Sequence, residues 1–349
     1  MPLNYDKMVK LYDGRPDAKL IDSTGIFYQN WIEELDRTVK PQLMYVSYLR
    51  DMPIKPVSVG SGSSSFILGK ATGNTTKKGF IAPGSNQIPE VGVTTGKYEL
   101  KLHEWGLQIS NNIFEIAMAQ RAGIALEDEQ YKSLLRHWHL DVDATAYTGD
   151  GDLGFPGLLT YAAATGSTNN GVSLPSGYPS TSASYVQSST SWASATPVQI
   201  LTDINNLCKT VHLASAYDMA PTVLGVGASA LAALAQPMTA AGYTSVAEYV
   251  KKNAYSTTVN GKELEIRLMK HAMDVAGVNG ATVTVPASGF NSRVIAYFPD
   301  FDHIRMPLST LEHGPVEYRS LQQSVSYYAK VGQPEFIYPE RVGYLDHNA

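Results

Sequence analysis

The sequence has a single cysteine, Cys208, among its 349 residues. One thiol cannot form an internal disulfide or supply a zinc site built from several cysteines. Its surroundings, INNLCKTVHL, predict the buried face of a helix, where a cysteine acts as a small hydrophobic side chain. We therefore predict no catalytic role for this thiol.

Long apolar runs are also missing. The chain starts MPLNYDKMVKLYDGR, without the apolar core of a signal peptide. No later segment has the roughly 18 consecutive apolar residues that a membrane span requires. We expect a soluble protein that is made in the cytoplasm and has no membrane contact.

Charge is scarce, since Asp, Glu, Lys and Arg make up 17% of the chain, whereas soluble domains have roughly 25%. The net charge of −5 disfavours broad binding to a nucleic-acid backbone, which needs clustered Lys and Arg. Low charge together with 21 tyrosines is typical of surfaces that partner chains cover. The composition favours an assembly.

The residues that are present divide the chain into successive segments. Residues 1–60 predict an arm with one helix, in which apolar residues recur at helical spacing from Phe27 until Pro41. Residues 61–110 predict a long two-stranded hairpin with a middle rich in Gly, Ser and Thr. An isolated hairpin is marginal in water, so we expect another subunit to support it.

Residues 126–147 predict the clearest helix of the chain, with an apolar stripe and acidic residues in its first turn. Its length would be roughly 33 Å. A charge-poor loop over 165–196 and a mixed α/β region should follow. Alternating residues from about Val316 predict closing strands.

The stretch DVDATAYTGDGDLGFPGLLT, from Asp141 to Thr160, gathers aspartates and glycines directly after two histidines. A calcium loop would need a glycine at its sixth position, where this chain has Ala146. The helical pairs His137/Asp141 and His139/Asp143 could each hold a metal, but they lie about 200° apart around a helix. We interpret the aspartates as residues of a solvated helix face and a turn.

A nucleotide site is the next alternative. TVLGVGASALAAL contains Gly225, Gly227 and Ala230 in a GxGxxA pattern between a predicted strand and a helix. Pro237 ends that helix early, and the acidic residue expected about twenty positions later, Glu248, falls within another helix. We therefore interpret the pattern as a tight turn from strand to helix.

Nucleophilic catalysis has no matching motif, since no GxSxG elbow occurs. FPDFDHIRMPLSTLEH gathers acidic residues and histidines without a recognisable ligand spacing: Asp300, Asp302, His303, Glu312 and His313. We interpret this segment as a polar loop, with a metal site as the weaker alternative.

The order of segments resembles the major capsid proteins of tailed bacteriophages of the Hong Kong 97 type. In that family a helix ends in a "Gly-Asp-Gly … Gly-Leu" corner, which Gly149-Asp150-Gly151 and Gly157-Leu158-Leu159 match. A helix similar to PVQILTDINNLCKTV then precedes an apolar strand, as in MAPTVLGV, and a further helix, as in ASALAAL. The end, SVSYYAKVGQPEFIYPERVGYLD, is similar to the family's last strands. The resemblance runs from about Ile26 to Asp346.

The resemblance implies an α+β class, the Hong Kong 97-like capsid fold. Its parts would be an N-terminal arm (1–63), an extended E-loop hairpin (64–105), a peripheral domain (106–159) with spine helix 126–147, an axial domain (160–312), and closing strands of the peripheral domain (313–349).

The resemblance also implies a function without catalysis: self-assembly into pentamers and hexamers of an icosahedral virus head around double-stranded DNA. It implies no catalytic, cofactor-binding or metal-binding residue. The implied partners are the protein itself, a separate scaffolding protein, a portal, a possible decoration protein, and packaged DNA contacted non-specifically. The location would be the virion capsid, after synthesis in the host cytoplasm. An encapsulin-like shell that stores cargo, or an α/β nucleotide-dependent enzyme, is the alternative.

Some members of this family have a scaffolding segment before the arm that is cleaved during maturation. Here the arm starts at once, so we expect no processing of this chain. Other members join a lysine to an asparagine across subunits. Lys70, Lys77 and Lys78 lie in the expected E-loop, but the sequence indicates no partner for them.

Overall fold

The computed structural model describes residues 45–60, 62, 64–68, 72–74, 92–94, 97–122, 126–150, 153–161, 184–188, 191–192, 194–238, 242, 244–272, 275–276, 282–283 and 290–348. The helix expected in the arm lies outside these residues. Within them, no helix is long and apolar enough to cross a membrane.

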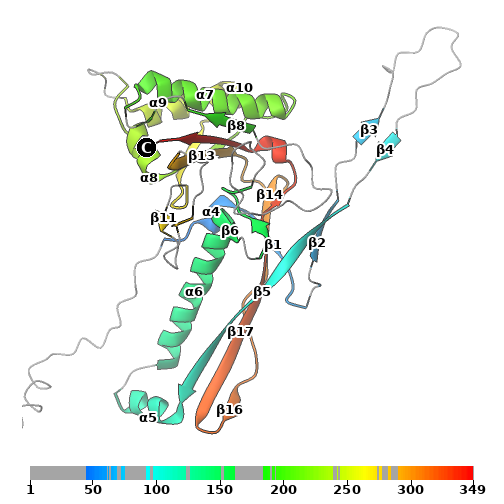
Figure 1. Ribbon diagram of the computed structural model, residues 1–349, viewed down its shortest axis with the longest axis vertical. Helices are drawn as coiled ribbons and strands as arrows, with labels where there is room; N and C mark the ends of the chain where they lie inside the picture. The colour runs from blue at the N-terminus through cyan, green and yellow to red at the C-terminus, as the bar shows by residue number, and fades with distance from the viewer. Residues whose placement is uncertain are drawn as a thin grey trace, which may run out of the picture.

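The larger sheet of the described part has eight strands, and its centre is a long two-stranded ribbon (Figure 1). The ribbon consists of β5 (Lys97–Asn112) and β17 (Gln322–Gly332), which pair antiparallel from Asn112 opposite Gln322 to Leu102 opposite Gly332. The other strands flank it: β1 (Ile54–Pro56), β2 (Ser64–Leu68), β14 (Ile304–Leu308), β15 (Glu312–His313), β16 (Glu317–Arg319) and β18 (Glu335–Phe336).

The predicted hairpin is present at its base. β2 pairs antiparallel with the first residues of β5, and further out β3 (Thr72–Asn74) pairs with β4 (Gly92–Thr94). β5 continues past the hairpin from Leu102 to Asn112, where it pairs with β17. One strand therefore connects the hairpin to the ribbon.

The predicted long helix is α6 (Leu126–Thr148), which lies alongside the ribbon (Figure 1). The short helix α5 (Ile113–Ala122) precedes it at the end of the ribbon. After α6 the chain turns through a small hairpin of β6 (Gly149–Asp150) and β7 (Phe155–Pro156).

The smaller sheet has five strands in the order β10-β9-β13-β19-β8. They are β8 (Ser184–Gln187), β9 (Val223–Val226), β10 (Glu265–Leu268), β13 (Ser292–Tyr297) and β19 (Gly343–His347). Four helices accompany them: α7 (Pro197–Ala214), α8 (Ala228–Leu234), α9 (Val246–Asn253) and α10 (Tyr255–Asn260). β11 (Val275–Ala276) and β12 (Thr282–Val283) form a separate pair.

Two expectations about the closing strands differ from this topology. β19, expected with the strands of the larger sheet, pairs with β13 and β8 in the smaller one. β14, expected before the boundary at residue 312 with the smaller sheet, pairs with β1 and β17 in the larger one. The predicted loop over 165–196 also contains β8. Strand patterns do not encode the partner strand, which explains these differences.

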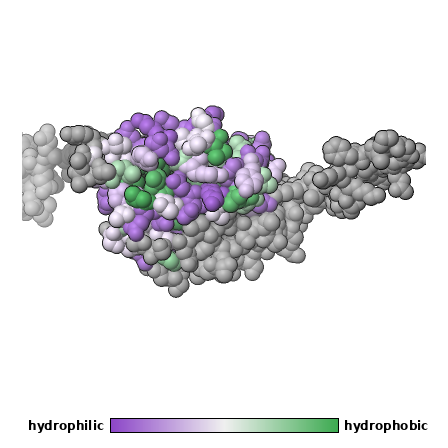
Figure 2. Space-filling model, turned by 90° about the horizontal axis from the view of Figure 1, so that it is seen from above, coloured by the Kyte–Doolittle hydropathy of each residue, from purple (hydrophilic) through white to green (hydrophobic). Residues whose placement is uncertain are grey.

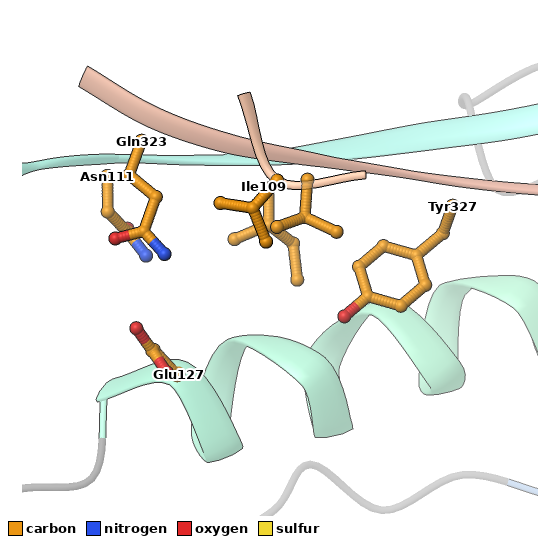
Figure 3. A pocket seen from close by; sticks show the side chains of 7 residues that line it. Ile109, Asn111, Glu127, Gln323 and Tyr327 are labelled. Carbon is orange, nitrogen blue, oxygen red and sulfur yellow. The ribbon is translucent and has the colours of Figure 1, made fainter. Parts of the chain in front are cut away.

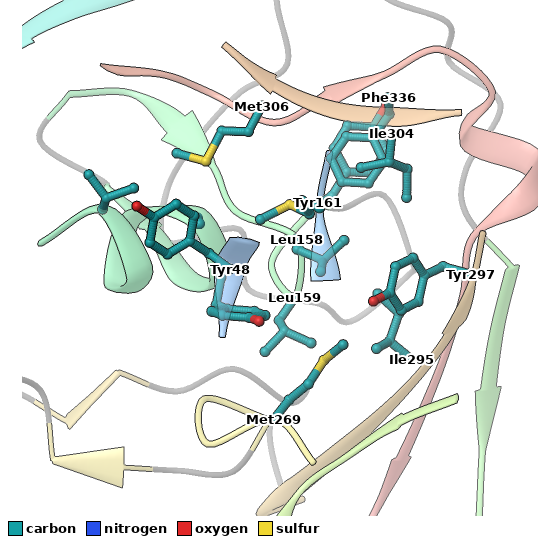
Figure 4. Packing of buried hydrophobic residues seen from close by; sticks show 14 of the residues in the cluster. Tyr48, Leu158, Leu159, Tyr161, Met269, Ile295, Tyr297, Ile304, Met306 and Phe336 are labelled. Carbon is teal, nitrogen blue, oxygen red and sulfur yellow. The ribbon is translucent and has the colours of Figure 1, made fainter. Parts of the chain in front are cut away.

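The buried hydrophobic residues form two clusters. One joins α6, the corner after it and the larger sheet, and it includes Leu158, Met306 and Phe336 (Figure 4). The other lies between α7 and the smaller sheet. α7 begins with a capping box, in which the Thr196 side chain accepts a hydrogen bond from Gln199 N.

Candidate functional site

The corner after α6 depends on glycine. Gly149 has a φ of 70°, in the left-handed region that favours glycine. A Cβ on Gly157 would lie 2.4 Å from both the Tyr147 carbonyl and Gly149 N. The close approach lets Leu158 N donate to the Ala146 oxygen at 2.8 Å. The glycines turn the chain out of the helix, as predicted.

Asp143 corrects the prediction of a solvated helix face, because its side chain is fully buried at 0% exposure. Its Oδ1 accepts hydrogen bonds from Ser47 N at 3.0 Å and Tyr48 N at 3.2 Å. Its Oδ2 lies 2.9 Å from Lys270 Nζ and 3.1 Å from His271 Nε2. One carboxylate therefore joins α6 to two segments that are distant in the sequence.

The environment of Asp143 stabilises its ionised form. Burial by itself raises the pKa of this carboxyl group, but hydrogen bonds from His271, from Ser47 N and from Lys270 outweigh burial. The pKa of Asp143 is consequently lowered from its ordinary value. The side chain is a structural anion at neutral pH.

A second buried carboxylate, Asp51 in α4 (Tyr48–Asp51), strengthens this junction. The Tyr147 hydroxyl donates a hydrogen bond to Asp51, and Arg50 Nε lies 2.7 Å from its Oδ1. Burial, followed by the negative charge of Asp51, raises the pKa of the Tyr147 hydroxyl. Arg267 of β10 contacts the same carboxylate at 3.5 Å, so the junction reaches the smaller sheet.

The other residues of the suggested metal pairs do not converge. His139 Nδ1 lies 3.1 Å from the Tyr48 hydroxyl, Asp141 accepts from Trp105 Nε1 at 2.9 Å, and His137 is exposed. No group of three His, Cys, Asp or Glu side chains in the described ranges is placed to hold a metal ion. His139 and Asp141 connect α6 to α4 and β5.

The GxGxxA pattern serves packing. A Cβ on Gly225 would lie 2.5 Å from the Met269 side chain and 2.7 Å from Ile295 Cγ2. Gly227 precedes α8, which has seven residues, and Ala230 is buried in the core. β9 is parallel to β10 but antiparallel to β13, unlike the parallel sheet of a dinucleotide-binding fold. The predicted tight turn from strand to helix is confirmed.

The segment from Phe298 to His313 was predicted to be a polar loop, but it contains the strands β14 and β15. His303 is buried between Phe298 and Tyr338, where burial and then the charge of Arg341 lower its pKa. Glu312 and His313 pair with β17 further along.

Cys208 is buried in the α7 core, as predicted, and burial raises the pKa of its thiol to about 12. Such a thiol is poorly suited to act as a nucleophile. The three lysines of the expected E-loop, Lys70, Lys77 and Lys78, lie outside the described residues.

The β5–β17 ribbon has two chemically different faces, because successive side chains of a strand alternate between them. One face packs on α6. Trp105 packs against Trp138 in a tilted arrangement with ring centroids 4.7 Å apart, and the ring centroids of Tyr327 and Tyr131 are 5.6 Å apart.

On the opposite face, the outer halves of β5 and β17 carry polar side chains without charge. Cross-strand pairs bring six residues together there: Gln108 with Ser326, Ser110 with Ser324, and Asn112 with Gln322. The sequence contains this signal in GLQISN and QQSVS, but only strand pairing places the residues on one surface. β16, which pairs with β17, adds the charged residues Glu317 and Arg319 at the edge of this face.

The end of the ribbon exposes large apolar side chains. Phe114 and Met118 of α5 are 62% and 61% exposed, and Tyr318 of β16 is 72% exposed. Ile113 N donates to the Leu321 oxygen at 3.0 Å, which fixes α5 beside the turn after β16. An apolar group at the end of a long extension is typical of a protein contact surface.

At the opposite end of the molecule, near α7 and α10, the surface mixes hydrophobic and hydrophilic residues (Figure 2). Seen from the side of α7 and α10, hydrophobic residues form small separate patches among hydrophilic ones (Figure 2). α7 leaves Val198 and Leu213 exposed on this side of the core. We therefore consider the ribbon and its end the strongest candidate surface for self-association.

Comparison with known proteins identifies a family that this sequence matches and solved structures with this fold. Over residues 77–347, the sequence matches a family described as major capsid protein. This range includes all of β5 and α6, and every strand of both sheets except β1 and β2. No curated protein sequence matches the chain.

Solved structures share the fold. The capsid of Myoviridae phage XM1 matches with a TM-score of 0.66 at 13% identity, covering 91% of this chain and 97% of that chain. Mycobacterium phage Ogopogo matches with a TM-score of 0.54 at 13% identity, covering 93% and 99%. The capsid of a native GTA particle matches with a TM-score of 0.57 at 10% identity, covering 91% and 95%.

Proposed function

Because this chain belongs to the family of major capsid proteins, we propose that it assembles into the pentamers and hexamers of an icosahedral head enclosing double-stranded DNA. The single observation that carries this proposal is the family match across most of the chain. The exposed apolar end of the ribbon supports it, because large apolar side chains grouped on a surface are typical of a contact with another protein.

We assign the parts of the chain as follows. Residues 1–63 form the arm, residues 64–105 the E-loop, and α6 the spine helix of a peripheral domain. The axial domain is built on the smaller sheet, and β19 belongs to it because it pairs with β13 and β8. β14 and β17 belong to the peripheral domain because they pair in the larger sheet.

The E-loop assignment explains why a hairpin extends from the molecule. β2 pairs with β5 over five residues, from Ser64 opposite Lys101 to Leu68 opposite Lys97. A two-stranded hairpin without a covered face has little stability of its own. In the shell, a neighbouring subunit would cover it.

The partners follow from this role. The first partner is the protein itself, and a separate scaffolding protein and a portal complete assembly. A decoration protein could bind the outside, while packaged DNA contacts the inside non-specifically. The protein is made in the host cytoplasm and resides in the virion capsid, and we propose no catalytic activity.

The test is to replace residues 69–96 with Asn-Gly, a two-residue turn that suits a hairpin closed between Leu68 and Lys97. We expect a folded chain with an unchanged urea midpoint that no longer forms stable shells by sedimentation and negative-stain microscopy. Shells as abundant as those of the unaltered chain would contradict the E-loop assignment. Small discrete oligomers from the unaltered chain, even with its scaffold, would contradict the function, and protein cargo in place of DNA would favour a storage shell.

A further inference from the structure

A groove lies between the end of the ribbon and the first turn of α6 (Figure 3). Its volume is about 160 Å³. The residues that line it come from β5, β17, α6 and the segment before β16: Ile109, Asn111, Glu127, Val316, Gln323, Val325 and Tyr327. It opens beside the exposed apolar end of the ribbon.

The groove combines an apolar floor with hydrogen-bond acceptors. Ile109 and Val325 are cross-strand neighbours on the floor, and Glu127 faces the ribbon from α6 (Figure 3). Glu127 lies opposite Asn111 and Gln323, whereas Tyr327 lines the other end of the groove (Figure 3). Asn111 is already satisfied by a double hydrogen bond with Gln130, at 2.7 and 2.6 Å.

Glu127 makes no ion pair with any residue that the structure describes. The acidic neighbour Glu129, by contrast, pairs with Lys132 at 2.8 Å. An unpaired carboxylate above an apolar floor suits the side chain of arginine or lysine, whose methylene groups pack while the head forms a charge-assisted hydrogen bond. The groove therefore fits a basic side chain.

Arg319 of β16 is a suitable basic side chain. It is exposed, and it forms no ion pair within the described part of the chain. It pairs with Gln322, on the uncharged face of the ribbon, whereas Tyr318 pairs with Gln323 of the groove. Arg319 thus points away from the groove of its own chain, although both lie at the same end of the ribbon.

We propose that Arg319 of one copy inserts into the groove of a second copy and pairs with its Glu127. This inference rests on the proposed shell function, which brings copies of the chain together. Arg319 and the groove lie on opposite faces of the same end of the ribbon. The face of one copy that carries Arg319 therefore contacts the groove-bearing face of the next copy. Such a contact is heterologous and closes into a ring when copies are related by rotation about this end.

Charge exchange tests the pair in the full-length chain. We expect Glu127→Arg and Arg319→Glu each to raise the concentration needed for shell assembly by at least about tenfold, because each places like charges in the contact. The double variant should recover most of this loss. Asp128→Arg, in the same turn, and Glu317→Lys, on the same strand and face, are matched controls that should assemble normally.

Folding is measured separately, by circular dichroism and urea unfolding. Glu127→Arg and Asp128→Arg both place a cation in the first turn of α6, so these two variants should lose the same small amount of stability. Arg319→Glu and Glu317→Lys lie outside any helix and should unfold like the unaltered protein. Normal assembly of both single variants, no recovery in the double variant, or equal loss in the controls would each overturn the proposal. Failure of the unaltered chain to form shells would instead overturn the proposed function.

Discussion

Replacing Asp143 with asparagine should destabilise the protein strongly. The amide keeps one oxygen, which can still accept hydrogen bonds from Ser47 N and Tyr48 N. The new NH₂ group would face Lys270 and His271, where the carboxylate now accepts. The substitution therefore preserves shape but removes the buried negative charge.

The magnitude follows from what is lost. Removing one partner of a buried ion pair costs about 3–5 kcal/mol. Lys270 is 33% exposed and can regain water, which places the expected loss at the low end, about 3 kcal/mol. Asp141→Asn is the matched control on the same helix, because an amide oxygen can still accept from Trp105 Nε1. We expect that variant to lose less than about 1 kcal/mol.

The assay is urea unfolding of the full chain, followed by tryptophan fluorescence, at several pH values. The folded-state pKa of Asp143 is lowered, so its contribution is fully present above the unfolded pKa of about 4 and is lost as the pH falls through the folded pKa. The gap between wild type and Asp143→Asn should therefore narrow below about pH 4. A loss under about 0.5 kcal/mol at pH 7 would refute the role of this carboxylate.

Two further predictions concern a buried histidine and the corner. His347 is fully buried and stacked on Trp192, and burial lowers its pKa; the unfolded chain therefore binds its proton more readily, and stability should fall as the pH drops below about 6.5. His347→Phe should make the unfolding free energy less dependent on pH in that range. The same dependence of the unfolding free energy on pH in both proteins would contradict the lowered pKa of His347. Gly157→Ala should cost at least about 3 kcal/mol or prevent folding, because its Cβ would lie 2.4 Å from the Tyr147 carbonyl. Gly154→Ala, where φ is +75° but the space is open, should cost only about 1–2 kcal/mol in the same unfolding assay, and equal costs would argue against the close approach.

Several elements were predictable because their signals are local. The helix over 126–147 is observed one residue longer, and the glycine corner follows it as expected. The apolar stripe, predicted to include Tyr131, Trp138 and Val142, faces the ribbon and the core, but Tyr131 stays 42% exposed while Trp138 and Val142 are buried. Helical spacing gives a direction around the axis, but the width of the covered face depends on what packs there.

The groove at the end of the ribbon, and the arginine proposed to enter it, were less predictable from the sequence. In the sequence, Glu127 is one of three acidic residues that suit the N-terminus of a helix. Arg319 lies among the predicted closing strands, and no motif marks it. Nothing along the sequence brings them to one end of the molecule. The antiparallel pairing of β5 with β17, across more than two hundred residues of chain, decides that position.

The sequence by itself determined the order of segments, the long helix, its corner and the resemblance to a capsid protein. These depend on residues within a few positions of one another. Only the tertiary structure decided which aspartate is buried: Asp141 and Asp143 are two residues apart, yet they point about 200° apart around the helix. Asp143 meets segments 96 and 128 residues away, and burial depends on such distant partners rather than on neighbouring residues.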